Sequence, residues 1–157
     1  MLEPPQNVLL YDSHCLLCDS SVRRLMAWLP AAQLGFAPLH GETAQAVRAR
    51  HASVNDSLRC PAIDAVPNSE QFTTAILVLD FASANERVLF RSDAVLEIFR
   101  MGGKFWRLLA WLGACLPRGL RDLFYTIVAR QRYRWFGPAT HSLCEMPSPA
   151  QAARLLP

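Results

Sequence analysis

The alternation of short apolar runs with amphipathic stretches near the N-terminus is the feature that most constrains the fold. Residues 7–11 and 34–38 predict two buried strands, each flanked by proline or turn-forming residues. A helix between them is predicted by an apolar stripe at helical spacing: Cys18, Val22, Leu25, Met26 and Leu29. Residues 42–51 predict a second helix that Gly41 precedes. A strand-helix-strand-helix order implies a parallel strand pair joined by a right-handed crossover.

The α/β pattern resumes after an interruption. Residues 52–72 show little periodicity and predict a long loop. Residues 75–79 and 87–90 then predict a β-hairpin. Ser92 is placed to cap a third helix, which the pair Gly102–Gly103 ends. The expected fold class is therefore α/β.

The last third of the chain is predicted to be helical. Residues 105–116 and 120–135 predict two helices that a proline and a glycine separate. We expect an α/β domain over residues 1–101. Residues 102–157 are expected to form a basic helical extension with a Pro-containing tail, packed on the same domain.

Positive charge is concentrated in this extension. Residues 100–136 hold eight basic residues and one acidic residue, although the net charge of the whole chain is only +3. Fifteen of the sixteen cations are arginine, which pairs with carboxylates in a bidentate manner and stacks on aromatic rings. We interpret the basic face as a solvated, salt-bridged surface and expect no nucleic-acid binding. Peripheral contact of the basic helices with a membrane is the alternative.

The cysteines favour a reducing compartment. They are odd in number, with one close pair: Cys15, Cys18, Cys60, Cys115 and Cys144. A disulfide-stapled secreted scaffold favours an even count in a shorter chain. Neither a signal-peptide pattern nor a run of about 20 apolar residues is visible. We expect a soluble, cytoplasmic protein, with Cys115 in the core because it lies in an apolar predicted helix.

The motif Asp12-Ser-His14-Cys15-Leu-Leu-Cys18 carries the predicted chemistry, because it lies between the first strand and the first helix. The unpaired N–H groups of a helix N-terminus stabilise a thiolate, and only a thiolate attacks a disulfide. We expect an accessible, attacking Cys15 and a buried, resolving Cys18 on the apolar stripe. A protonated His14 would lower the pKa of the Cys15 thiol, whereas Asp12 would raise it.

The roles of the flanking residues are open at this point. Asp12 is either a proton acceptor for Cys18 during resolution or a cap of the turn. Because Leu16 and Leu17 bring no side-chain donors, thiolate stabilisation rests on backbone amides and on His14. This predicts a moderately reducing couple and not a strong oxidant.

A zinc site is the alternative use of the cysteine pair. His141-Ser-Leu-Cys144 is a second two-ligand unit, and with Cys15 and Cys18 it would complete a Cys₃His site. A zinc knuckle usually occupies a tight turn between strands, whereas this pair precedes an amphipathic helix. The context therefore favours redox chemistry over a zinc-binding or partner-docking module.

These residues resemble the DCC family of thiol-disulfide oxidoreductases, small proteins common in bacteria. The signature is Asp12-x-x-Cys15-x-x-Cys18 after a strand, and the resemblance extends over nearly the whole chain. The further matching segments are Ser92-Asp93-Ala94, Pro117, Arg121-Asp122, Tyr125, Ala129-Arg130, Arg132-Tyr133, Phe136-Gly137 and Cys144. The resemblance implies a thioredoxin-like core with a C-terminal helical extension.

The resemblance also implies an activity and a set of site residues. Asp12, Cys15 and Cys18 are the expected catalytic residues, and His14 is expected to modulate them. The accessory positions are Ser92, Asp93, Arg121, Asp122, Arg132, Tyr133 and Cys144. We expect the charged members on the helices to form an ion-pair network that clamps the extension to the core. The expected partners are a disulfide- or thiol-containing protein or small molecule and an external thiol reductant, with no cofactor or metal.

Overall fold

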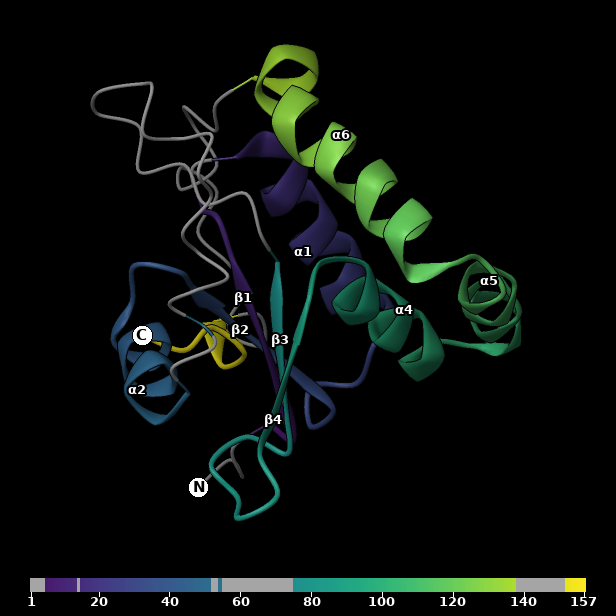
Figure 1. Cartoon of the computed structure of the whole chain (residues 1–157). Coiled ribbons are helices and arrows are strands. Elements are labelled where there is room, and N and C mark those ends of the chain that lie inside the picture. The colour runs from purple at the N-terminus through teal and green to yellow at the C-terminus, as the bar shows by residue number, and fades with distance from the viewer. Residues whose placement is uncertain (1–4, 14, 52–53, 55–74, 138–151) are drawn as a thin grey trace.

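A four-stranded mixed sheet forms the centre of the protein (Figure 1). The structure is a computed structural model, and it describes residues 5–13, 15–51, 54, 75–137 and 152–157. The strands follow the order β2-β1-β3-β4, with the bounds β1 (Asn7–Tyr11), β2 (Leu34–Pro38), β3 (Ile76–Leu79) and β4 (Arg87–Phe90). β1 pairs parallel with β2 and antiparallel with β3, which pairs antiparallel with β4. The predicted parallel pair and hairpin are both present.

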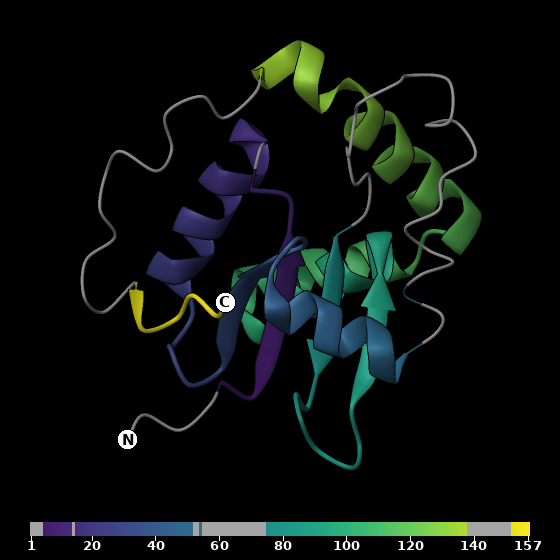
Figure 2. The ribbon, with the colours of Figure 1, turned by 90° about the vertical axis from the view of Figure 1, so that its left-hand side faces the viewer.

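Helices cover both faces of this sheet (Figure 2). Their bounds are α1 (Leu16–Trp28), α2 (Glu42–Arg50), α4 (Arg91–Met101), α5 (Lys104–Ala114) and α6 (Arg118–Phe136). α1 and α4 lie on one face and α2 lies on the other. This mixed α/β arrangement is compatible with a thioredoxin-like fold, as the sequence predicted.

The apolar run of β1 supplies residues to two hydrophobic clusters. Leu9 packs with the buried residues of α1 and α4, whereas Val8 and Leu10 pack with those of α2. Successive side chains of a strand point to opposite faces of the sheet. A central strand that is covered on both sides therefore has to be apolar throughout, and all three of these residues are buried.

The final residues of the chain return to the free edge of β2. Phe36 donates its N–H to the Arg154 carbonyl (2.9 Å) and accepts the Leu156 N–H (2.8 Å). The guanidinium of Arg154 lies 5.3 Å from the centre of the Phe36 ring. It donates hydrogen bonds of 2.8–3.2 Å to the carbonyl oxygens of Met26, Leu29 and Leu34. This buried arginine thus joins α1, the α1–β2 connection and β2.

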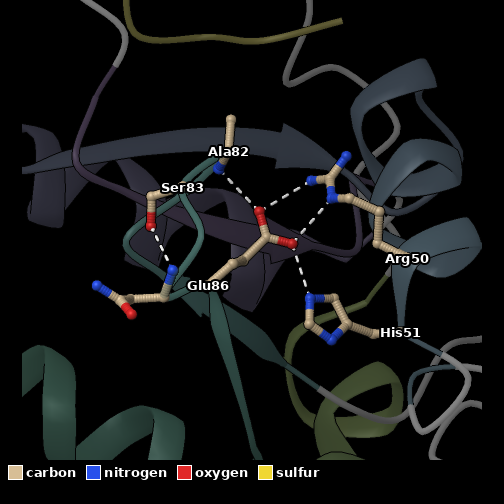
Figure 3. A network of polar contacts seen from close by, with 6 residues as sticks. Arg50, His51, Ala82, Ser83 and Glu86 are labelled. Atoms are coloured by element: carbon tan, nitrogen blue, oxygen red, sulfur yellow. Dashed lines mark hydrogen bonds and ion pairs between the residues drawn. The ribbon is translucent and has the colours of Figure 1, made fainter.

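The turn between β3 and β4 is held to the end of α2 by Glu86 (Figure 3). Its carboxylate accepts hydrogen bonds from Arg50 (2.9 and 3.0 Å) and from the Ala82 N–H (2.8 Å), and it lies 2.7 Å from Nε2 of His51. Burial raises the pKa of Glu86, but the bonds from Arg50, Ala82 and His51 outweigh burial and lower it overall.

Ser92 does not cap α4, contrary to the prediction. The helix begins at Arg91 with Phe90 in the N-cap position, so Ser92 lies within the first turn. Its hydroxyl donates instead to the carboxylate of Asp122 on α6. The hydroxyl is therefore used to join two helices and not to satisfy the backbone of one.

Apolar residues at helical spacing in α6 are largely exposed. Leu120, Leu123, Phe124, Ile127 and Val128 are 41–57% exposed, and Cys115, predicted in the core, is exposed as well. α6 contacts α4 and α1, and its buried residues are Ala129 and Arg132. The predicted helix over residues 120–135 is thus present, within α6 (Arg118–Phe136). In the described part of the chain, no helix has both the length and the apolarity needed to cross a bilayer.

Replacing Arg154 with alanine should destabilise the protein. The change leaves the carbonyl oxygens of three buried segments without the donor they have now, which corresponds to about 2–4 kcal/mol of unfolding free energy. Chemical denaturation of Arg154→Ala measures this loss. Arg100→Ala is the matched control, because Arg100 is exposed on α4 and pairs only with its neighbour Glu97 among the described contacts. It should cost less than about 0.5 kcal/mol; equal losses would contradict the anchoring role.

Candidate functional site

The cysteine pair lies where β1 ends and α1 begins, as the sequence predicted. Cys15 is the N-cap residue of α1, with extended backbone angles (φ −106°, ψ 121°), and its carbonyl accepts the Asp19 N–H at 3.0 Å. The Cys15 N–H points back to the Asp12 carbonyl at 3.4 Å and closes the turn. Cys18 follows in the first turn of α1, so both sulfurs lie at the end of the helix that carries unpaired N–H groups.

The exposure of the two thiols is the reverse of the prediction. Cys15 is completely buried, whereas Cys18 is partly exposed. The apolar stripe of α1 placed Cys18 with Val22 and Leu25, which are indeed buried. At the first turn, however, the Cys15 side chain lies inside the protein before the helix begins. Helical periodicity cannot predict the direction of a side chain at the N-cap.

Arg132 of α6 joins the site from the other end of the chain. Its Nη2 donates to Oδ2 of Asp12 at 2.7 Å, and its Nη1 lies 3.4 Å from Sγ of Cys18. The side chains of Arg132 and Asp12 are 6% and 2% exposed, so this is a buried ion pair. The sequence predicted Arg132 as part of a clamp, but it did not predict the contact with the cysteine. No spacing pattern could reveal this contact, because Arg132 and Cys18 are 114 positions apart.

These contacts move the pKa values of the two thiols in opposite directions. A hydrogen bond with the Cys18 side chain lowers the pKa of Cys15 most. Burial opposes the shift, while the N–H groups of Cys18 and Leu17 and the charge of Arg132 assist it, so that the pKa of Cys15 falls to about 6. The pKa of the Cys18 thiol is raised by the same hydrogen bond and by burial. At neutral pH the pair therefore carries one thiolate, on Cys15, and one proton, on Cys18.

The accessory charged residues form a second set of contacts, which joins α4 to α6. The carboxylate of Asp93 lies 2.7 Å from Nη2 of Arg118 and 3.2 Å from Nη1 of Arg121. Next to it, Ser92 donates to Asp122. The predicted clamp is therefore present for Asp93 and Arg121. Asp122 instead accepts a hydrogen bond from the Ser92 hydroxyl, and Arg132 pairs with Asp12 and not with Asp93.

Several predicted residues lie outside the described part of the chain. These are His14, Cys60, His141 and Cys144, and the side chain of Tyr133 within α6 also falls outside it. Among the described residues, no group of three or more His, Cys, Asp or Glu side chains could hold a metal ion. The zinc alternative, which needs His141 and Cys144, stays a prediction.

An apolar cavity of about 620 Å³ lies beside the cysteine pair. α1, α4, α5 and α6 all contribute to its wall, which is predominantly apolar and includes Leu96, Phe99, Trp106 and Val128. Cys18, Asp12 and Arg132 also line it, whereas Cys15 does not. The sequence did not predict this cavity, because it depends on how the helical extension sits against the core.

Comparison with known proteins identifies the family of this chain. Residues 9–138 match the model of the DCC1-like thiol-disulfide oxidoreductase family, and the chain belongs to this family. It is also similar to the uncharacterized protein YuxK of Bacillus subtilis (strain 168), with 29% identity over 153 residues that cover 98% of this chain and 96% of that protein. No solved structure matches the chain. The family predicted from the signature is thus confirmed.

The thiolate should be measurable by titration. Because the pKa of Cys15 is lowered to about 6, thiolate absorbance in the reduced protein should appear as the pH rises through 6 and should already be present at pH 7. Arg132→Met removes a cation that stabilises this thiolate, so its appearance should move to higher pH, and Arg132→Lys should restore part of the shift. Arg134→Met, an exposed change on the same helix, is the control. An unchanged titration in Arg132→Met would contradict the role of the guanidinium.

Proposed function

We propose that this protein catalyses thiol-disulfide exchange through its Cys15–Cys18 pair, which cycles between a dithiol and a disulfide without a bound cofactor. The observation that carries the proposal is the position of both cysteines at the N-terminus of α1, where Nη1 of the buried Arg132 lies 3.4 Å from Sγ of Cys18 and the pKa of the Cys15 thiol is lowered to about 6. A lowered thiol pKa beside a second cysteine is the arrangement that disulfide exchange requires. Membership of the family supports the same activity.

The electron balance of the proposed cycle is simple. The reduced pair gives two electrons to a substrate disulfide, which becomes two thiols, and the protein sulfurs form a Cys15–Cys18 disulfide. An external thiol reductant returns the pair to the dithiol in the same way. Run in reverse, the cycle oxidises substrate thiols, and the direction is set by the reduction potential of the pair against that of its partners.

The pKa of Cys15 supports a couple of intermediate reducing strength. Among CxxC proteins, thiol pKa values run from about 3.5 in the strongest oxidants to about 7 in reducing ones. A value of about 6 lies nearer the reducing end. Asp12 and Arg132 oppose each other here, because the carboxylate raises the pKa of Cys18 and the guanidinium lowers it.

A redox titration tests the proposed activity. The protein is equilibrated across a series of thiol–disulfide buffers, trapped by alkylation and analysed by peptide mass spectrometry. We expect a Cys15–Cys18 disulfide to form in a two-electron transition, and Cys15→Ser to lose it. If the pair stays reduced across the whole physiological range of potentials, the proposed function is wrong.

A further inference from the structure

We propose that Cys18, and not Cys15, is the sulfur that exchanges with the substrate, and that the substrate is a small disulfide or thiol whose apolar body occupies the cavity beside Cys18. Cys15 then acts as the inner sulfur, which closes and opens the internal disulfide. This inference rests on the proposed function and specifies its substrate class and its sulfur order.

The first part of the proposal, that Cys18 exchanges with the substrate, rests on how accessible the two sulfurs are. Disulfide exchange requires three sulfurs nearly in line, so the sulfur that meets the substrate has to be reachable. Cys18 is partly exposed and lines the cavity, whereas Cys15 is completely buried and is not part of the cavity wall. Nη1 of Arg132 lies 3.4 Å from Sγ of Cys18, where it stabilises negative charge that develops on this sulfur during exchange.

The second part of the proposal, that the substrate is a small molecule with an apolar body, rests on the wall of the cavity. A volume of about 620 Å³ lies within the range of small-molecule sites, which are mostly apolar with a few polar groups that fix orientation. The charged groups of the wall are Asp12, Arg24, Arg121 and Arg132. Asp12 and Arg132 form an ion pair with each other, Arg121 pairs with Asp93, and Arg24 is exposed on α1. A substrate with an apolar body and no strong charge matches this wall better than a polar one.

In the reducing direction the steps balance as follows. The Cys18 thiol passes its proton to the Cys15 thiolate and attacks one sulfur of R–S–S–R; the Cys18–S–S–R bond forms, the substrate S–S bond breaks, and RS⁻ leaves with the proton from Cys15. The Cys15 thiolate then attacks Sγ of Cys18, forms the internal disulfide and releases the second RS⁻, which takes a proton from water. The pair loses two electrons and the substrate gains them.

The reverse direction uses the same geometry. A substrate thiolate in the cavity attacks Sγ of Cys18 in the oxidised pair, and Cys15 is the leaving group. A thiol of low pKa leaves faster, which suits the pKa of Cys15 of about 6. The burial of Cys15 and the stabilisation of its thiolate therefore both suit the role of the inner sulfur, which leaves when a substrate attacks Cys18.

Trapping of the mixed disulfide tests the sulfur order. Reduced Cys15→Ser and Cys18→Ser variants are treated with dipropyl disulfide, and the propylthio adducts are located by peptide mapping, with the exposed Cys115 as the internal reference. We expect a stable adduct on Cys18 in Cys15→Ser, and an adduct on Cys15 that forms at least about tenfold more slowly in Cys18→Ser. A faster adduct on Cys15 overturns the order while leaving the redox activity of the pair intact. Failure of the wild-type pair to form its internal disulfide overturns the proposed function itself.

A pair of isosteric substrates tests the cavity. Dipropyl disulfide and bis(2-hydroxyethyl) disulfide have equal numbers of heavy atoms but differ in polarity, and their rates with a free dithiol give the intrinsic reactivity. Relative to that reference, the wild-type protein should prefer dipropyl disulfide by about tenfold. Val128→Trp, or Val128→Gln if the first variant does not fold, should abolish the preference. Leu123→Trp is the control, because Leu123 is exposed on the same helix and does not line the cavity. No preference in the wild-type protein, or a preference that both Val128 variants keep, overturns the substrate class.

A separate observation supports a second proposal: we infer that the outer face of α5 and α6 docks on an anionic membrane surface. Within the described part of the chain, twelve of the fourteen exposed large hydrophobic residues lie between Phe105 and Phe136, and nine of these twelve do not line the cavity. Trp111 and Trp135 are 63% and 60% exposed. Exposed cations accompany them on the same two helices, namely Lys104, Arg107, Arg130 and Arg134. Asp122, the acidic residue of this segment, is turned inward to Ser92.

The positive charge on this face of α5 and α6 favours an anionic membrane as its partner. So many exposed large hydrophobic side chains on two consecutive helices indicate an interaction site. Amphipathic helices with Trp, Phe and Leu beside Lys and Arg bind the interface of anionic bilayers, where each cation near the surface contributes to binding. A second copy of this chain would bring like charges together, so a membrane surface fits better than self-association.

Vesicle co-sedimentation tests the membrane contact. The protein should bind vesicles of phosphatidylglycerol and phosphatidylcholine and not vesicles of phosphatidylcholine alone. The double variant Arg130→Glu, Arg134→Glu should weaken binding by more than about tenfold. The double variant Arg24→Glu, Arg87→Glu is the control of equal charge, since both residues are exposed on other elements. Equal binding to both vesicles, binding to neither, or a dimer that buries this face in solution would overturn the proposal.

Discussion

The buried ion pair between Asp12 and Arg132 is the interaction on which the site depends. It joins the turn after β1 to the last helix, with both side chains almost fully removed from solvent. A buried pair contributes little by itself, but removal of one partner leaves a buried charge uncompensated at a cost of about 3–5 kcal/mol. The core and the extension are therefore coupled at the same point where the redox chemistry is proposed.

This coupling also sets the electrostatics of the cysteines. Arg132 reaches Cys18 while it holds Asp12, so one guanidinium serves both a carboxylate and a sulfur. The hydrogen bond with the Cys18 side chain stabilises the Cys15 thiolate most, and backbone N–H groups at the start of α1 and the charge of Arg132 assist it. The hydrogen bond between the two thiols lowers the pKa of Cys15 and, together with burial, raises that of Cys18, which Arg132 opposes. A change at either end of the chain is thus expected to alter thiol chemistry as well as stability.

The helical extension uses its faces for different purposes. Its inner face carries Arg132 and the contacts of Arg118 and Arg121 with Asp93, which fix it against α4 and α1. The face turned to the cavity is apolar and surrounds the exposed side of Cys18. Its outer face is apolar and cationic and lies in solvent. These faces explain why a segment with such a strong apolar pattern contributes few residues to the core.

Local signals in the sequence determined the elements, the family and the position of the cysteine pair. These signals are apolar runs, helical periodicity and the Asp12-x-x-Cys15-x-x-Cys18 signature. Each depends on residues only a few positions apart, so each can be recognised from the sequence alone. The contact of Arg132 with Asp12 and Cys18, the burial of Cys15, the exposure of Leu123 and Cys115, and the cavity were decided only by the tertiary structure. Each depends on how α6 is rotated and placed against α1 and α4. That placement arises from packing and ion pairs between residues up to 120 positions apart, for which the sequence carries no periodic signal.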